Sequence, residues 1–299
     1  MQNKTEEWLM ESKYMSWLEK SGAPLLRGAG TLWTLYHGAL VPASPFPEYP
    51  EVDSGQADSL LKASGAWLIR YSTAPCDYET SWWYVVCSNH DPTDIRAKTR
   101  SEIKRGRREC IVHEVDPGWL ADNGYPCYCA AVARYRDLKP VAEGVFKKII
   151  LNTRDGPFCY WTVFHEGHLA GYCQCIIEGM HVSTNVAKYD PLYLRHRSAY
   201  ALIDTLIQTY VVGKGMTLCN GNRSIAHNTN YQDFLIKLGF RKQFCRLNVV
   251  YNPLLKLAVD ALYPIRSMLA GLPGLRIINR ARALLFQEEI RRTASANGR

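Results

Sequence analysis

Two hydrophobic periods alternate along this chain and predict a succession of helices and strands. In residues 5–20 the apolar side chains return about every 3.6 positions, which predicts a helix with Trp8, Leu9, Tyr14, Trp17 and Leu18 on one side. Residues 31–41 are rich in aromatic and β-preferring residues and predict a strand or a hairpin. A short helix is expected at Ser54–Ser64, and compact apolar runs predict buried strands at 66–72, 82–87 and 111–115.

Proline and helix-capping residues mark further boundaries in the first half. Four prolines make residues 42–50 an extended loop, which either lines a substrate cleft or simply connects two elements. Asp91-Pro92 supplies an N-cap and a first helical residue, so we expect a helix from there to about Arg108. Another helix is expected within 117–135, and a linker to a second unit between residues 137 and 155.

Residues 158–251 predict a compact α/β unit. Strands at Cys159–His165 and Leu169–Ile177 flank Glu166-Gly167, which is a hairpin signal. The pattern then predicts a strand at Met180–Ala187, a helix at Leu194–Val212, a strand at Met216–Asn220, a helix at Thr229–Leu238 ended by Gly239, and a last strand at Phe244–Tyr251. We expect the strands of this unit to shelter a ligand.

The last part of the chain, from Pro253 to Arg299, is helical in pattern and basic. Apolar residues such as Leu254 and Leu257 alternate with polar ones, Pro264 and Pro273 interrupt the pattern, and several arginines follow. Lysine and arginine beside apolar residues are typical of a helix that lies on an anionic membrane surface. The alternative is a helix that docks on the protein's own core.

Composition narrows the class of protein. With 299 residues, 47% of them hydrophobic, the chain can build a large core, and we expect two domains, at 1–145 and 146–252, followed by a basic tail at 253–299. The net charge of +8 favours an anionic partner or marks a basic surface. The first 20 residues have no apolar core of a secretion signal, and no run of about 18 apolar residues occurs, so we expect a cytoplasmic protein.

The ten cysteines do not predict a metal site. No C-x-x-C pair occurs, and Cys127/Cys129 and Cys173/Cys175 are each two apart, which on a strand places each pair on one face. We therefore expect reduced, largely buried thiols and no bound metal. Gly213-Lys214-Gly215 lacks the spacing of a phosphate-binding loop, and no Gly-x-Ser-x-Gly elbow predicts a covalent mechanism.

Two short motifs and the order of elements resemble a known superfamily. The stretch Phe234-Leu-Ile-Lys-Leu-Gly239-Phe240-Arg241 is similar to the Gly-Phe ending of a helix in acyl-CoA N-acyltransferases (GNAT), and Asn228 falls where many members carry an Asn. Thr99-Arg100-Ser-Glu-Ile-Lys104-Arg105-Gly106 resembles a basic helix of the divergent Fem-like branch. Together with the element order, the resemblance spans most of residues 30–251 and implies two tandem GNAT-like domains of mixed sheet flanked by helices.

The resemblance implies a mechanism of direct attack. An acyl donor enters between two strands that separate, a backbone N–H on the strand Met180–Ala187 polarises the carbonyl, and a pyrophosphate sits at the start of the next helix. That helix start carries Arg195, His196, Arg197 and Ser198, which with Asn228 are the residues expected to bind the donor, acetyl-CoA or another acyl-CoA. Some Fem-like members use aminoacyl-tRNA instead.

This chain departs from the superfamily pattern at two places. Ser198 stands where the phosphate-binding loop normally has a glycine, and Leu235 stands where a tyrosine acid is frequent. Tyr231, one turn earlier, is the candidate acid, or else a packing residue. The candidate bases that take a proton from the attacking amine are His181, Glu178 and His165, with His181 preferred because it lies on the strand that presents the N–H.

The predicted helix 91–108 presents a basic stripe of Arg96, Arg100, Lys104 and Arg108, opposite Ile95, Thr99 and Ile103, which we expect to pack inward. The stripe either contacts an anionic substrate, through Arg100, Lys104 and Arg105, or is a solvated face partly neutralised by Asp94, Glu102 and Glu109.

The sequence therefore predicts an N-acyltransferase that moves an acyl or aminoacyl group from a thioester or ester to an amine, such as an amino sugar or a cell-wall precursor. The alternative is a non-catalytic GNAT-fold binding or scaffold protein at a membrane surface. A nucleic-acid-binding module comes third, and we expect no DNA partner, because basic and aromatic residues do not interleave as on a single-strand platform.

Overall fold

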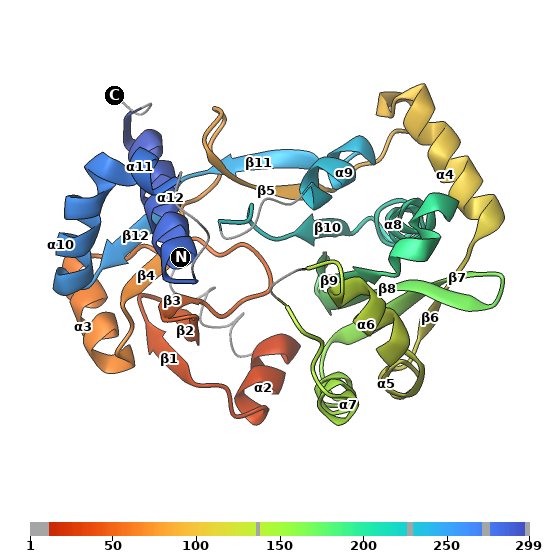
Figure 1. Ribbon diagram of the computed structural model, residues 1–299, viewed down its shortest axis with the longest axis horizontal. Coiled ribbons are helices and arrows are strands. Elements are labelled where there is room, and N and C mark those ends of the chain that lie inside the picture. The colour runs from red at the N-terminus through yellow and green to blue at the C-terminus, as the bar shows by residue number, and fades with distance from the viewer. Residues whose placement is uncertain (1–11, 136–137, 226–229, 271–275, 297–299) are drawn as a thin grey trace.

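Two mixed β-sheets lie side by side, with helices packed over them (Figure 1). The computed structural model describes residues 12–135, 138–225, 230–270 and 276–296. The smaller sheet has five strands in the order β1-β2-β3-β4-β12, which are β1 (Leu25–Gly28), β2 (Thr31–Tyr36), β3 (Ala39–Pro42), β4 (Leu68–Ser72) and β12 (Leu247–Tyr251). The expected strand or hairpin at 31–41 is the hairpin of β2 and β3.

The larger sheet has seven strands in the order β11-β5-β10-β9-β8-β7-β6. These strands are β11 (Arg241–Cys245), β5 (Trp82–Cys87), β10 (Thr217–Asn220), β9 (His181–Tyr189), β8 (His168–Glu178), β7 (Phe158–His165) and β6 (Ile111–Val115). Only β9 and β10 pair in parallel in this sheet. The predicted β7–β8 hairpin is confirmed, and its turn has positive φ at Glu166 and at Gly167, where glycine adopts that backbone without steric cost.

The two sheets exchange strands, so neither is built from one continuous half of the chain. After β4 the chain leaves the smaller sheet and enters the larger one as β5, and after β11 it returns as β12, which pairs with β4. The prediction of a single last strand from Phe244 to Tyr251 is therefore wrong. Buried Cys245 and Leu247 belong to different sheets. The Arg246 backbone N–H between them donates to the hydroxyl of Thr73 at the other crossing, and the Thr73 N–H donates to the Arg246 carbonyl.

The described ranges contain eleven α-helices. They are α2 (Lys13–Lys20), α3 (Ser54–Ser64), α4 (Ala97–Glu109), α5 (Pro117–Asn123), α6 (Tyr125–Val132), α7 (Glu143–Leu151), α8 (Ser198–Leu206), α9 (Tyr231–Lys237), α10 (Pro253–Leu262), α11 (Arg266–Ala270) and α12 (Arg276–Ala296). Short 3₁₀ segments form η1 (Pro92–Asp94), η2 (Pro191–His196) and η4 (Tyr263–Ile265), and η3 (Ile207–Val212) is a π-helix.

Helices cover both faces of the larger sheet. One face packs against α4, α8 and α9 through a core that includes Ile103, Leu202 and Leu235. The other face packs against α5, α6 and α7 through Leu120, Cys127 and Phe146. The sheet is therefore sandwiched, and a ligand reaches its strands only where they separate or where the helices leave a pocket.

Several predicted helices are interrupted where tertiary packing intervenes. The helix expected from Asp91 begins only at Ala97, because Ile95 is extended with its side chain buried. The expected helix 194–212 is split into η2, α8 and η3, since Arg197 adopts a left-handed backbone with φ of 63°. The helix expected in 117–135 breaks at Gly124, so Cys127 and Cys129 lie on α6 and not on a strand. The stretch 137–155 contains α7.

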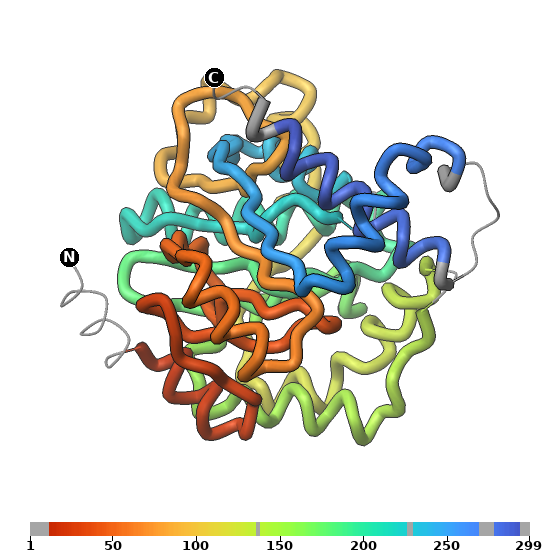
Figure 2. Tube along the Cα trace, turned by 90° about the vertical axis from the view of Figure 1, so that its left-hand side faces the viewer, coloured from red at the N-terminus to blue at the C-terminus, as the bar shows by residue number. Residues whose placement is uncertain are grey.

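The end of the chain docks on the smaller sheet. Helix α12 packs against β12, and the Tyr251 hydroxyl donates to Glu288 at 3.0 Å. Arg291 and Arg292 both bond the buried Glu288 carboxylate, and although burial acts to raise it, they hold the pKa of Glu288 at about 2. Helices α10 and α12 lie side by side (Figure 2). No helix in the described ranges is long and apolar enough to cross a membrane.

Candidate active site

The two parallel strands of the larger sheet separate midway along β9. Strand β10 pairs with β9 only at His181–Ser183, and β9 continues to Tyr189 without a β10 partner. At the point of separation the Asn220 amide donates to the Thr184 carbonyl at 2.9 Å and to its hydroxyl at 3.1 Å. Beyond Thr184 this edge of β9 has no strand partner, and this divergence of β9 from β10 is called the gap below.

A β-bulge lies at the opening of this gap. The register between β8 and β9 shifts so that Asn185 has no opposing residue: Thr184 faces Cys175 and Val186 faces Gln174. A bulge twists its strand and redirects its side chains and backbone groups. The Asn185 side-chain amide donates to the Gln174 side-chain oxygen at 2.7 Å, and the Gln174 side-chain amide donates to the Tyr160 hydroxyl at 2.6 Å, which fixes the bulged segment on β8 and β7.

One side of the bulged strand opens into a pocket of about 470 Å³. It lies between α2, α6, α7 and the strands, and its walls are largely aromatic, with Tyr14, Trp17, Tyr128, Phe146, Phe158, Tyr160, Tyr172, Gln174, Asn185, Val186 and Lys188 among the lining residues. Pockets of this size and apolar character with a few polar groups are typical ligand sites. That these strands shelter a ligand stays a prediction.

Lys188 is the basic side chain of this pocket. Burial lowers the pKa of its ammonium group, because the charged form loses hydration. A lysine whose pKa is lowered carries more of the neutral amine near pH 7 and can accept a proton. Sequence reasoning missed Lys188, Asn185 and Gln174; the available signal was that polar residues interrupt otherwise apolar strands.

The opposite side of β9 presents two buried tyrosines. Neighbouring residues of a strand point to opposite faces, so Tyr189 lies behind the sheet from Lys188. Its ring fits over Gly171, where an added Cβ would come within 2.6 Å of it. The Tyr189 and Tyr231 hydroxyls are neighbours in the core, and burial raises the pKa of both well above the usual range. Both therefore retain their protons at neutral pH.

The predicted catalytic residues fall into separate places. His181 starts β9 at the exposed β8–β9 turn, paired in register with Glu178, and its ring contacts Phe46. The Glu178 carboxylate accepts the Tyr14 backbone N–H at 3.3 Å. Tyr231 instead lies beside Tyr189 at the other end of β9, roughly 25 Å along the strand from His181 at 3.3 Å per residue. His165 contacts the Glu109 carbonyl and stacks on His196.

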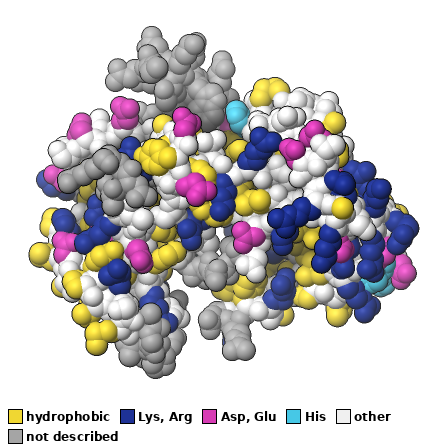
Figure 3. All heavy atoms as spheres, turned by 90° about the horizontal axis from the view of Figure 1, so that it is seen from above, with side chains coloured by type: hydrophobic (Ala, Val, Ile, Leu, Met, Phe, Trp, Pro, Cys, Tyr) yellow, Lys and Arg dark blue, Asp and Glu magenta, His cyan; other side chains and the backbone are white. Residues whose placement is uncertain are grey.

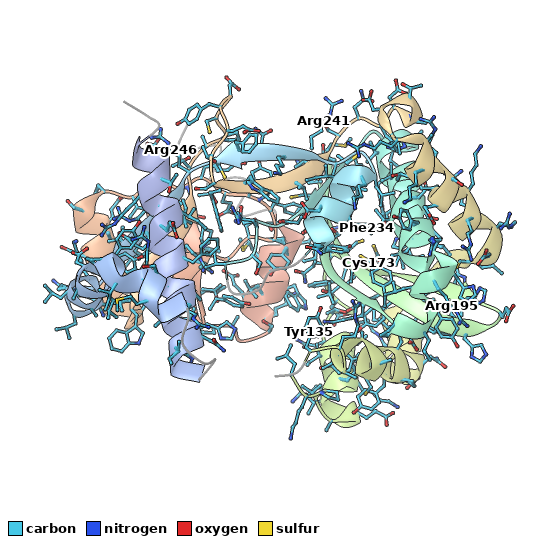
Figure 4. The ribbon with its side chains drawn as sticks, turned by 45° about the horizontal axis from the view of Figure 1, so that its top comes forward. Tyr135, Cys173, Arg195, Phe234, Arg241 and Arg246 are labelled. Carbon is cyan, nitrogen blue, oxygen red and sulfur yellow. The ribbon has the colours of Figure 1, made fainter. Side chains whose placement is uncertain are left out.

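The residues expected to bind a pyrophosphate are already engaged with the protein. Arg197 pairs with Glu102, and the His196 imidazole lies 3.0 Å from the Glu109 carboxylate. Ser198 is fully buried, with its hydroxyl donating to the Tyr193 carbonyl at 3.3 Å. Arg195 is exposed at the outer edge of the molecule, away from Cys173 and Phe234 in the interior (Figure 4). Asn228 lies outside the described residues.

Helix α4 covers the start of α8. Gly106 allows this contact, since a Cβ there would lie 2.7 Å from the Arg197 carbonyl oxygen and 3.1 Å from the Ala201 nitrogen. Glu102 and Glu109 of α4 therefore lie beside the N-terminus of α8, which is the end of that helix that would attract an anion. Hydrogen bonds from Arg105 and His196 lower the pKa of Glu109 to about 2, so it is ionised at neutral pH.

The outer face of α4 is strongly basic. Residues 96–109 contain seven lysines and arginines and two glutamates, a net charge of +5 (7 − 2). Arg100 donates to the Pro92 and Ile95 carbonyls, Arg105 pairs with Glu109, and Lys104 is exposed with no carboxylate partner among the described side chains. The inward face expected from the sequence is confirmed: Ile95, Thr99 and Ile103 are buried. Lysines and arginines gather over this end of the molecule (Figure 3).

The arrangement suits proton transfer on either side of a carbonyl held in the gap. Lys188, whose pKa is lowered by burial, and the protonated phenol of Tyr231 lie on opposite faces of β9, and the edge of β9 beyond Thr184 has no strand partner. No cluster of three or more metal-binding side chains occurs within the described part of the chain.

No family sequence model and no curated protein sequence matches this chain. Solved structures do resemble it. The C-terminal domain of a putative lysylphosphatidylglycerol synthetase from Agrobacterium fabrum aligns with 88% of this chain and 96% of its own, with a TM-score of 0.56 and 11% identity. L-PGS from Bacillus licheniformis aligns with 89% of this chain and 95% of its own, with a TM-score of 0.54 and 12% identity. FemX aligns with 86% of this chain and 98% of its own, with a TM-score of 0.54 and 9% identity.

These similarities establish the fold. At such low identity they carry no residue-level information, but they extend over most of both chains. The protein has the GNAT fold in its Fem-like form, with two mixed sheets and a C-terminal helix. The fold predicted from the sequence resemblance is confirmed.

Proposed function

We propose that this GNAT-fold chain is a transferase that moves an aminoacyl group from an aminoacyl-tRNA ester to an amine. The observation that carries the proposal is the gap between β9 and β10, with a bulge at its mouth and an aromatic pocket beside it. The ester carbonyl would lie in the gap against the unpaired edge of β9. The acceptor amine would enter through the pocket.

The proposed chemistry is a single direct attack. Lys188, as the neutral amine, takes the proton from the acceptor nitrogen, a C–N bond forms at the carbonyl carbon, and the C–O bond to the tRNA ribose breaks. Tyr231 supplies the proton to the departing oxygen. The acceptor gains the aminoacyl group, the tRNA ribose leaves as an alcohol, and no covalent enzyme intermediate forms. This agrees with the direct attack that the sequence resemblance implies. His181 and Glu178 take no part in this scheme because they lie at the far end of β9.

The environment of α8 favours tRNA over CoA as the donor. A CoA pyrophosphate at the start of α8 would meet α4 and the two carboxylates Glu102 and Glu109, which already contact Arg197 and His196. The exposed cations of α4 instead form a surface that suits the phosphates of a nucleic-acid backbone. One structural relative is named as a putative lysylphosphatidylglycerol synthetase, and the product in that name is a lipid joined to an amino acid.

The donor is tested by binding and by transfer. We expect labelled total tRNA to be retained on filters by this protein with an affinity that falls steeply as salt rises, because several phosphates are neutralised. The double change Lys98→Ala and Lys104→Ala lowers both affinity and salt slope, while Lys62→Ala on α3 does neither. In the same preparation, radiolabelled aminoacyl-tRNA and a primary amine yield labelled amide.

Two results would contradict this donor. Tight calorimetric binding of acetyl-CoA that is lost in Arg195→Ala would point to CoA. Binding of tRNA without any transfer to primary amines would support the non-catalytic alternative.

We further propose that α10, η4 and α11 contact an anionic membrane surface. Leu254, Leu257, Ala261, Ile265 and Met268 are exposed and follow one another at steps of three and four residues, which makes one apolar stripe. Residues 253–292 carry seven basic and three acidic side chains, a net charge of +4 (7 − 3). An apolar stripe within basic surroundings fits anionic lipid headgroups. Helix α12, in contrast, docks on β12, as in the alternative considered from the sequence.

A further inference from the structure

A second pocket, of about 230 Å³, lies where the two sheets meet. Its walls come from β3, β4, the start of β5, the proline-rich loop and the segment that follows β10. Prominent lining residues are Ser44, Phe46, Glu48, Arg70, Trp82 and Asn222. The proline-rich loop therefore lines a cleft, one of the two roles considered for it. This pocket is separate from the one that contains Lys188.

Arg70 brings a positive charge into this pocket that no acidic group of the described protein neutralises. It projects from β4, is largely buried, and donates to the Gln287 side-chain oxygen of α12 at 3.2 Å. Burial lowers its pKa, since the charged form loses hydration. A buried guanidinium paired only with a neutral amide is costly, because its Coulomb attraction to a counter-ion is missing. An anion in the pocket would supply that attraction.

Glu48 adds a second polar group to the same wall. Its carboxylate accepts a hydrogen bond from the Thr31 hydroxyl at 2.5 Å, and burial raises its pKa. Trp82 contributes a flat aromatic surface, and its indole N–H is already satisfied by the Ser72 hydroxyl at 2.9 Å. The pocket thus combines a cation, a carboxyl group and an aromatic ring. Its volume is below the roughly 300–1,000 Å³ of sites that enclose drug-sized ligands.

We propose that this pocket is a binding site for a small molecule with an oxyanion, either a carboxylate or a phosphate, which pairs with the Arg70 guanidinium. Glu48 then bonds a hydroxyl or amine of the same molecule. The site lies near the β9–β10 gap, because Asn222 comes two residues after Asn220, which bridges the two strands where they separate. The inference does not depend on the proposed transfer reaction.

The test measures thermal unfolding of the full chain with inorganic phosphate, glycerol 3-phosphate, acetate and malonate at constant ionic strength. We expect a saturable rise in the midpoint with at least one of them, and the difference between phosphates and carboxylates identifies the class of anion. In Arg70→Met the half-saturating concentration rises at least about tenfold, since a charge-assisted contact is lost. Without ligand, Arg70→Met unfolds at the same temperature as the wild type or higher.

Arg134→Met, at an exposed position on the other side of the larger sheet, is the matched control and keeps the full response. Arg70→Lys retains a cation and keeps a weaker response, which preserves the test if Arg70→Met does not fold. No saturable shift with any of the four anions, or a shift of unchanged affinity in Arg70→Met, would overturn the proposal.

Discussion

At the scale of single residues, the proposed chemistry depends on the protonation of Lys188. Its pKa is lowered from the usual value near 10.5, so the neutral amine forms at a lower pH than in an exposed lysine. Since the neutral form is the base, kcat/KM for transfer should rise with pH and level off above the Lys188 pKa. Lys188→Met should lower kcat/KM by about 100-fold or more.

Two further variants distinguish a base from a simple contact. Lys188→Arg keeps the charge but stays protonated, so it should be as inactive as Lys188→Met. Lys148→Arg, at an exposed site on α7, should leave the pH profile unchanged. If Lys188→Arg retained the wild-type profile, Lys188 would not be the base.

At the scale of elements, the contact between α4 and α8 depends on the absence of a side chain at Gly106. Gly106→Ala should lower the free energy of unfolding by about 1–3 kcal/mol, because its Cβ would overlap backbone atoms that cannot move away easily. Gly144→Ala is the matched control: it lies in α7 with no atom within 4 Å of its Cβ, and should gain up to about 1 kcal/mol. Urea unfolding measures both. Equal stability of the two variants would refute the contact.

The exposed stripe on α10–α11 makes a prediction about membranes. Replacing Leu254, Leu257 and Met268 with Ser should reduce co-sedimentation with phosphatidylglycerol vesicles about tenfold or more, because each apolar side chain loses its favourable transfer into the interface. Replacing Ile111 and Leu192, which are each 71% exposed elsewhere, should have little effect. Unchanged partitioning of the first variant would rule out this surface as the membrane contact.

At the scale of the whole molecule, strand exchange couples the two sheets. The chain crosses between the sheets twice, from β4 to β5 and from β11 to β12, and Thr73 and Arg246 hydrogen-bond to each other at the crossings, so unfolding of one sheet frees strand ends of the other. We expect one thermal transition whose calorimetric and van't Hoff enthalpies agree. Two resolved transitions, or probes of the two sheets that disagree, would show that the sheets unfold separately.

Local patterns predicted much of this protein. Alternation and turn residues predicted the β7–β8 hairpin, the helix Ser54–Ser64 and the inward face of α4, since these features depend on side chains within a few positions of one another. The resemblance of the Gly239-Phe240 ending and of the basic helix gave the GNAT fold.

Long-range packing decided the rest. The extended backbone at Ile95 and the left-handed one at Arg197 arise because those segments pack against partners about 100 residues away in the chain, such as Glu102 against Arg197. The division of 244–251 between two sheets depends on pairing with β5 and β4, which no local pattern records. Lys188 and Arg70 became candidate site residues only through burial, since hydration lost to distant neighbours is what perturbs their charges.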